Sequence, residues 1–103
     1  MSDSKPQNVA VIGASNNRQK FGNKAVRAFA QQGYNVFPVN PAEKEIEGFK
    51  AYRSVLDIPE PLDLVSVYAP PAVGLRVLDE IAQKGVREIW FSPGSESDEI
   101  IEK

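Results

Sequence analysis

Residues 9–22 combine the residue types with which parallel α/β proteins hold an anion. An apolar run from Val9 to Ile12 leads into Gly13, and a short stretch of small and polar residues then precedes a helical pattern. Gly13 can adopt backbone angles that are closed to other residues, and the first amides of a helix have no partner inside that helix. The helix dipole adds positive potential at the same place, so the pattern predicts a phosphate-binding loop. A strand-to-helix turn that binds no ligand is the alternative interpretation.

Polar side chains in and near this loop suit a phosphate ligand. Ser15 and the loop amides can donate hydrogen bonds to phosphate oxygens. Arg18, Lys20 or Lys44 can neutralise the phosphate charge. The alternative is that these cations are solvated surface charges, which is the usual state of Lys and Arg.

The composition excludes several classes of chemistry. The 103 residues include neither Cys nor His, so this chain alone forms no disulfide, thiolate nucleophile, common zinc site or Ser-His catalytic pair. The 12 Lys and Arg against 14 Asp and Glu give a net charge of −2, which provides no basic field for nucleic acid or an anionic membrane. Paired carboxylates such as Glu45 and Glu47 lie in a polar stretch and are interpreted as solvated groups without chemistry.

The length indicates one domain. We expect residues 1–7, which are polar, to be a disordered tail and residues 8–103 to form the domain. The tail lacks the apolar core of a signal peptide, and no apolar run approaches the roughly 20 residues that cross a bilayer. These features favour a cytoplasmic location.

Apolar runs alternate with helical patterns along the chain. The predicted strands cover residues 8–13, 34–39, 49–53, 62–68 and 87–91. Helices are predicted over residues 23–32, from Pro70-Pro71 onward and from Asp98 onward, and Ser54 is a candidate cap for a turn at residues 55–58. The residues of the first two helices predicted to pack inward are Ala25, Val26, Ala28, Phe29 and Ala30, then Val73, Val77, Leu78, Ile81 and Ala82. Alternating strands and helices predict an α/β fold, a three-layer, doubly wound parallel sheet with strand order 3-2-1-4-5.

This topology predicts the position of the ligand. In doubly wound sheets the ligand lies outside the carboxyl ends of the strands, where the strand order reverses. Residues 13–22, 40–44 and 69–73 follow the first, second and fourth predicted strands, so these three loops are expected to converge there.

A nicotinamide-dinucleotide site is the alternative, but two of its typical sequence features are missing. The dinucleotide fingerprint has Gly-x-Gly-x-x-Gly, whereas Gly13 is followed by Ala14-Ser15-Asn16-Asn17-Arg18 and the next glycine is Gly22. An acidic residue is expected at the end of the second strand to bind the ribose, but Asn40 stands there, with Lys44 just beyond.

Four short motifs in order resemble the CoA-binding domain family. They are Gly13-Ala14-Ser15, Lys20-Phe21-Gly22, Val39-Asn40-Pro41 and Tyr68-Ala69-Pro70-Pro71. The resemblance spans nearly the whole chain and implies a Rossmann-like fold, similar to the amino-terminal domain of the succinyl-CoA synthetase α subunit. It also implies CoA as the ligand.

The resemblance assigns parts of CoA to these motifs. It places the phosphates near Ala14, Ser15 and Lys20, the adenosine end near Val39, Asn40 and Pro41, and the pantetheine arm along Ala69, Pro70 and Pro71. Two motifs have a structural alternative, because Pro70-Pro71 also suits a helix start and Asn40-Pro41 also suits a strand end.

The chain departs from the ligases of this family, which carry the phosphate on a histidine in a further domain. The chain has no histidine, and its 103 residues end before the family's usual last strand. We therefore expect a cytoplasmic protein that binds CoA or acyl-CoA without catalysis, alone, as a homo-oligomer or with a partner subunit. The alternative is the nucleotide-binding domain or subunit of an NAD(P)-dependent oxidoreductase or an acyl-CoA ligase.

Overall fold

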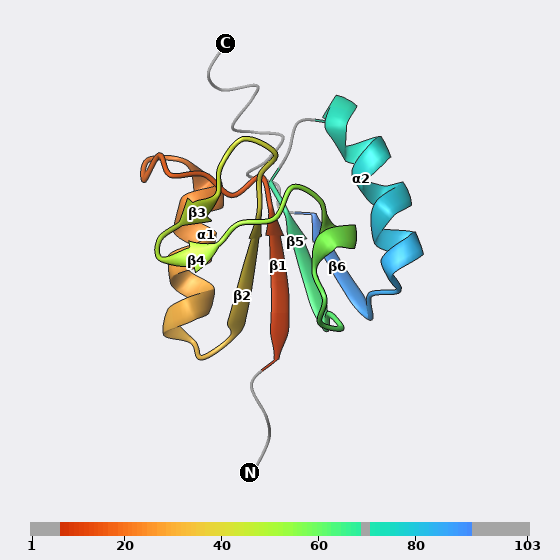
Figure 1. The fold of residues 1–103 in the computed structure, drawn as a ribbon, viewed down its shortest axis with the longest axis horizontal. Coiled ribbons are helices and arrows are strands. Elements are labelled where there is room, and N and C mark those ends of the chain that lie inside the picture. Colours follow the sequence, from red (N-terminus) through yellow and green to blue (C-terminus); the bar gives the residue numbers. More distant parts are fainter. Residues whose placement is uncertain (1–6, 69–70, 92–103) are drawn as a thin grey trace.

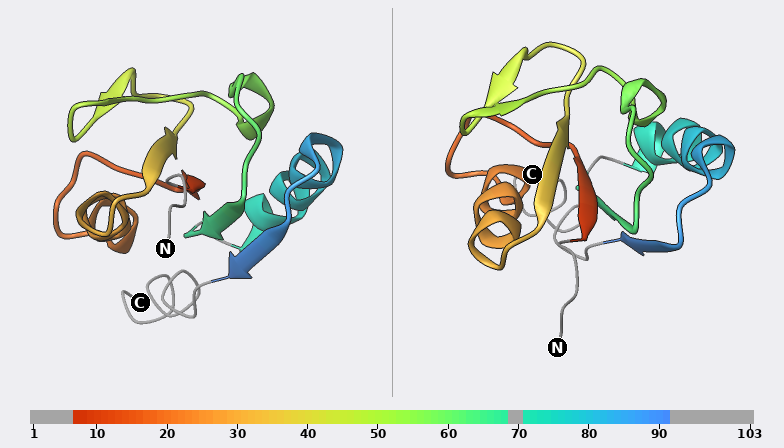
Figure 2. Two further views of the ribbon diagram at one scale, coloured as in Figure 1. Left: turned by 90° about the horizontal axis from the view of Figure 1, so that it is seen from below. Right: turned by 60° about the horizontal axis from the view of Figure 1, so that its bottom comes forward.

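The chain folds as three layers, with a parallel sheet between helices. The computed structural model describes residues 7–68 and 71–91, and for residues 71–76 and 91 it describes the backbone alone. Helices α1 (Phe21–Gln31) and α2 (Pro71–Lys84) lie on opposite faces of the sheet (Figures 1 and 2). This arrangement confirms the predicted α/β, Rossmann-like class.

The central sheet has four strands in the order β2-β1-β5-β6, all paired in parallel. They are β1 (Asn8–Ile12), β2 (Asn35–Val39), β5 (Leu64–Val67) and β6 (Glu88–Phe91). In the numbering of the predicted strands this order is 2-1-4-5, so four positions of the predicted order are confirmed. Every residue of β5 is buried, which is typical of a parallel strand covered on both faces.

The predicted third strand, residues 49–53, is wrong as a strand of this sheet. Residues 45–50 instead form a separate antiparallel hairpin of β3 (Glu45–Ile46) and β4 (Phe49–Lys50). Glu47 and Gly48 at its turn have φ values of 51° and 83°, the positive angles that a tight two-residue hairpin requires. Tyr52, just after β4, pairs with β2 through a parallel bridge to Val39. The chain bends at Arg53 and Ser54 directly after this bridge, so the pairing with β2 does not extend into a strand.

Each helix buries one stripe of side chains against the sheet. Ala25, Val26 and Phe29 of α1 pack against Val9 and Val11, as predicted. Val77 and Ile81 of α2 pack on the other face with Ala10, Ile12, Val65 and Val67. Ala28, Leu78 and Ala82 are exposed, contrary to prediction, because they lie beside the buried stripe of their helix.

A short 3-10 helix, η1 (Val55–Asp57), packs beside α2. Ser54 caps it as predicted, its Oγ accepting a hydrogen bond from the Leu56 amide at 3.1 Å.

The predicted helix from Asp98 lies outside the described residues. Gln7, at the end of the predicted tail, accepts a hydrogen bond from the Asn35 amide at 2.8 Å. Among the helices that the structure describes, none is long and apolar enough to span a membrane.

Candidate functional site

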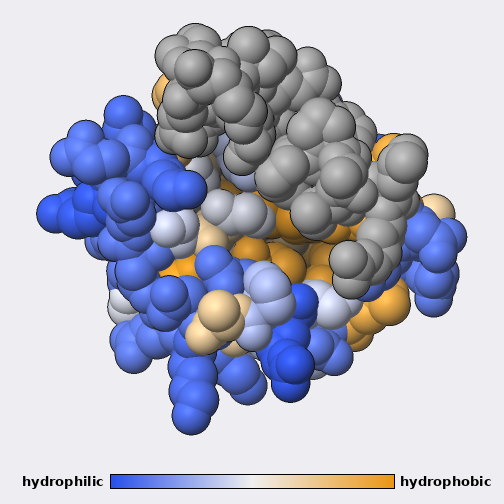
Figure 3. All heavy atoms as spheres, turned by 90° about the horizontal axis from the view of Figure 1, so that it is seen from above, coloured by the Kyte–Doolittle hydropathy of each residue, from blue (hydrophilic) through white to orange (hydrophobic). Residues whose placement is uncertain are grey.

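The loops that follow β1 and β2 meet at the carboxyl edge of the sheet. The Gly13 amide donates to the Val39 carbonyl at 3.2 Å, and the Tyr68 amide donates to the Ile12 carbonyl at 2.7 Å. The ends of three neighbouring strands therefore lie side by side, as the topology predicts. Figure 3 looks onto this edge, where hydrophilic residues border apolar ones nearer its centre. Ala69 and Pro70 of the third predicted loop lie outside the described residues, and Pro71 begins α2.

Two glycines allow the β1–α1 loop, residues 13–20, to pack tightly at this edge. Gly13 has φ +89°, and a Cβ there would lie 2.3 Å from the Tyr68 carbonyl oxygen. At Gly22 a Cβ would lie 2.0 Å from the Gly13 carbonyl oxygen. Neither position has room for a side chain. The two glycines therefore allow the backbone of the first turn of α1 to lie in close contact with the loop.

Side-chain amides hold the carbonyls of the β1–α1 loop. The Ala14 carbonyl accepts a hydrogen bond from Asn40 Nδ2 at 2.8 Å, and the Ser15 carbonyl accepts one from Asn23 Nδ2 at 2.9 Å. In a planar trans peptide the carbonyl and the following N–H point in opposite directions. The amide of Ser15 therefore points away from Asn40, and the amide of Asn16 points away from Asn23.

The N-terminus of α1 adds further donors. Lys20 occupies the N-cap position without a side-chain capping bond, and the first turn contains no acidic residue. The amides of Phe21 and Gly22 have no acceptor within residues 7–68 and 71–91. Unpaired first-turn amides and the positive end of the dipole favour a negatively charged group at this point.

The predicted cations differ in their surroundings. Arg18 Nε lies 3.4 Å from Glu47 Oε2, with the Arg18 side chain 64% exposed. Lys20 and Lys44 are exposed, and neither forms an ion pair with any residue that the structure describes. Two cations at this edge are therefore available to a ligand, while the third is already paired.

Asn40 links the two loops of the edge. Its Oδ1 accepts a hydrogen bond from the Ala42 amide at 2.7 Å, while its Nδ2 reaches Ala14. Val39, just before it, is buried in the core and offers a ligand little side-chain surface, whereas Pro41 is exposed. Asn40 thus orients the loop in addition to ending the strand.

Sequence reasoning missed Asn23. This side chain is fully buried, donating from Nδ2 to Ser15 and to Glu47 Oε2 at 2.9 Å, and accepting at Oδ1 from Arg27 Nε at 2.7 Å. Glu47, predicted to be a solvated group, is instead partly buried and paired with Asn23 and Arg18. The available signal was a polar residue three positions before the buried Val26, on the apolar stripe of a helix.

A profile of the family described as CoA binding domain matches residues 7–103. The chain belongs to the CoA-binding domain family. It is similar to the α subunit of ADP-forming acetate–CoA ligase II from Pyrococcus furiosus, with 40% identity over 85 residues, 82% of this chain and 19% of that subunit.

Two solved structures resemble this CoA-binding domain. A conserved hypothetical protein from Pyrococcus furiosus has a TM-score of 0.81 and 43% identity, covering 93% of this chain and 83% of that one. The dinucleotide-forming acetyl-CoA synthetase 1 of Ca. Korarchaeum cryptofilum, in complex with phosphate and ADP, has a TM-score of 0.74 and 34% identity, covering 79% and 18%. The chain thus spans about a fifth of the length of these ligase and synthetase relatives.

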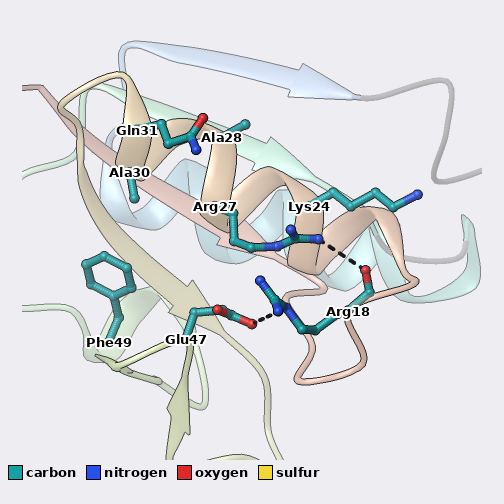
Figure 4. Close-up of a pocket in the computed structure, with 8 residues that line it drawn as sticks. All are labelled: Arg18, Lys24, Arg27, Ala28, Ala30, Gln31, Glu47 and Phe49. Carbon is teal, nitrogen blue, oxygen red and sulfur yellow. Dashed lines mark hydrogen bonds and ion pairs between the residues drawn. The ribbon is translucent and has the colours of Figure 1, made fainter.

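The CoA-binding domain also has an open groove of about 620 Å³ along α1, which includes Arg18 of the β1–α1 loop (Figure 4). Its lining residues are Arg18, Lys24, Arg27, Ala28, Ala30, Gln31, Glu47 and Phe49. Arg27 Nη2 donates to the Arg18 carbonyl at 3.2 Å, and Glu47 pairs with the Arg18 side chain. Arg27 and Glu47, which line this groove, therefore hold Arg18 of the β1–α1 loop in place.

Proposed function

We propose that this chain binds CoA or an acyl-CoA at the carboxyl edge of its sheet and makes or breaks no bonds by itself. The observation that carries this proposal is the orientation of the β1–α1 loop. Its carbonyls at Ala14 and Ser15 are held by side-chain amides, while the Phe21 and Gly22 amides of the α1 N-terminus have no acceptor among the described residues. These donors fit the pyrophosphate of CoA.

The remaining contacts are assigned by family motif and by charge. The pyrophosphate lies against Ala14 and Ser15 with Lys20 as its main counter-ion, because Arg18 is paired with Glu47. The adenosine end lies at Val39, Asn40 and Pro41, and Lys44 is the cation nearest to them in sequence, suited to the 3′-phosphate. The pantetheine arm passes Ala69, Pro70 and Pro71.

The absence of histidine and cysteine from the sequence supports a binding role. The second candidate is a domain of an acyl-CoA-forming ligase, favoured by the 40% identity to a ligase α subunit. A nicotinamide enzyme is less well supported, since Asn40 uses its side chain to hold Ala14 where a dinucleotide site needs an acidic ribose ligand.

Isothermal titration with CoA, dephospho-CoA and NAD tests the proposal. We expect saturable CoA binding, weaker binding of dephospho-CoA and no comparable binding of NAD. A preference for NAD would favour an oxidoreductase domain. No binding of any of the three by folded protein would rule out the CoA site in this chain. Formation of acyl-CoA from acid, CoA and ATP by the chain alone would contradict the absence of catalysis.

A further inference from the structure

Asn23 links the β1–α1 loop and the β3–β4 hairpin turn to helix α1. Its side chain is 0% exposed and bonds to the loop carbonyl of Ser15, to the carboxylate of Glu47 on the hairpin turn, and to Arg27 one turn along α1. We propose that Asn23 is a positioning residue of the ligand site, which orients the β1–α1 loop without touching the ligand. This inference rests on the proposed CoA binding.

The charges around Asn23 determine which way its amide faces. Both Nδ2 hydrogens are used by acceptors, the Ser15 carbonyl and Glu47 Oε2, while Oδ1 receives a hydrogen bond from the Arg27 guanidinium. Reversing the amide would place Oδ1 against a carbonyl and a carboxylate, and the amide nitrogen against a cation. Hydrogen bonds to charged groups are stronger than hydrogen bonds between neutral groups, so Glu47 and Arg27 hold the Asn23 amide in one orientation.

That orientation sets the direction of one loop peptide. Because Nδ2 of Asn23 holds the Ser15 carbonyl, the Asn16 amide in the same peptide plane points away from α1. A buried polar group lowers stability unless all its hydrogen bonds are made, and an apolar residue would fill this helix position without that requirement. The pairing of Asn23 with a loop carbonyl is therefore best explained by the loop conformation it maintains.

The β3–β4 hairpin belongs to the same support. Asn16 Nδ2 donates to Glu43 Oε1 at 2.9 Å and to the Glu45 carbonyl at 3.0 Å. Glu47, with its positive φ of 51°, reaches the loop through Arg18 and reaches α1 through Asn23. The hairpin and the residues just before it thus hold the loop through Asn16 and Arg18, and Glu47 fixes the orientation of the Asn23 amide.

The closing experiment compares Asn23→Asp with Ser54→Ala. Asp has nearly the same shape as Asn and retains the bond from Arg27, but it directs an oxygen at the Ser15 carbonyl and at Glu47. Ser54→Ala removes hydrogen bonds to Leu56 and Glu80 on the other face of the sheet, away from the loop. Circular dichroism and thermal melting identify variants that remain folded.

We expect folded Asn23→Asp to bind CoA about tenfold or more weakly, and Ser54→Ala to bind it normally. CoA and dephospho-CoA should weaken by the same factor, because both carry the pyrophosphate. Amide hydrogen exchange should become faster at residues 15–18 in Asn23→Asp alone. Adding Glu47→Gln to Asn23→Asp removes the repulsion between carboxylates and should restore part of the affinity.

The outcomes separate the two proposals. If the parent protein does not bind CoA, the proposed function fails, while hydrogen exchange still reports whether Asn23 holds the loop. If the parent binds CoA and folded Asn23→Asp binds it equally well with unchanged exchange in the loop, the positioning role is wrong. If Asn23→Asp does not fold, Asn23→Ser, which is smaller and uncharged, is measured against the same control, and unchanged affinity and exchange there also refute the role.

Discussion

Asn40 donates a hydrogen bond from Nδ2 to the carbonyl oxygen of Ala14 across 2.8 Å, joining the loop after β2 to the loop after β1. The two residues are 26 positions apart, and the parallel pairing of β1 with β2 brings them together. A single polar side chain at the end of β2 thereby orients the loop that the α1 N-terminus completes. In dinucleotide-binding sheets an acidic residue at this position binds the ribose, whereas here Asn40 stands there and binds the Ala14 carbonyl.

Asn40→Ala should lower the free energy of unfolding by about 1 kcal/mol and weaken CoA binding, because the Ala14 carbonyl loses its donor. Urea denaturation and titration calorimetry measure the two effects. Asn35→Ala is the matched control, since Asn35 donates to Asn8 Oδ1 at the opposite end of the same strands. Equal loss of CoA affinity in both variants would show that Asn40 has no specific role at the site.

Lys20→Ala should weaken CoA binding by about 1–3 kcal/mol, since a charge-assisted contact to the pyrophosphate is lost. The effect should decrease as salt is raised, because Lys20 is exposed and its charge is screened. Arg87→Ala removes an exposed cation just before β6, at the amino edge of the sheet, and should leave affinity unchanged. An unaltered CoA affinity in folded Lys20→Ala would remove Lys20 from the site.

Lys44→Ala should reduce the preference for CoA over dephospho-CoA, because we place the 3′-phosphate near this cation. The measured quantity is the ratio of the two dissociation constants by calorimetry. In Lys20→Ala the same ratio should stay close to that of the parent, since both ligands contain the pyrophosphate. A ratio unaffected by Lys44→Ala would assign the 3′-phosphate to another cation.

Gly22→Ala should destabilise the fold by about 1–3 kcal/mol, because its Cβ would lie 2.0 Å from the Gly13 carbonyl oxygen. The displaced helix turn should also weaken CoA binding. Gly33→Ala is the comparison: φ there is +94° and a Cβ would meet nothing within 4 Å, so this variant introduces backbone strain far from the site. Chemical denaturation should show both variants less stable, with CoA affinity reduced only in Gly22→Ala.

Local sequence patterns predicted the elements whose burial is complete. β1 and β5 are covered on both faces, and such strands are continuous apolar runs that single-sequence reasoning recognises. The strand predicted at residues 49–53 was wrong as a strand of the main sheet, because residues 49–50 form β4 of a hairpin and pairing with β2 is limited to the Tyr52 bridge. The non-glycine Glu47 at positive φ gives little signal of that hairpin in the sequence. The exposed Ala28 was misplaced because alanine suits either side of a helix.

The sequence by itself determined the α/β class, the β1–α1 loop with its obligatory Gly13, and the family to which the chain belongs, because these depend on residues close together in the chain. The tertiary structure alone decided which side chains hold that loop. Asn23 and Glu47 are 24 positions apart, and their bond exists only because the hairpin folds back against α1. Since a hydrogen bond requires two atoms within about 3 Å, partners brought together by the fold leave no pattern in a linear sequence.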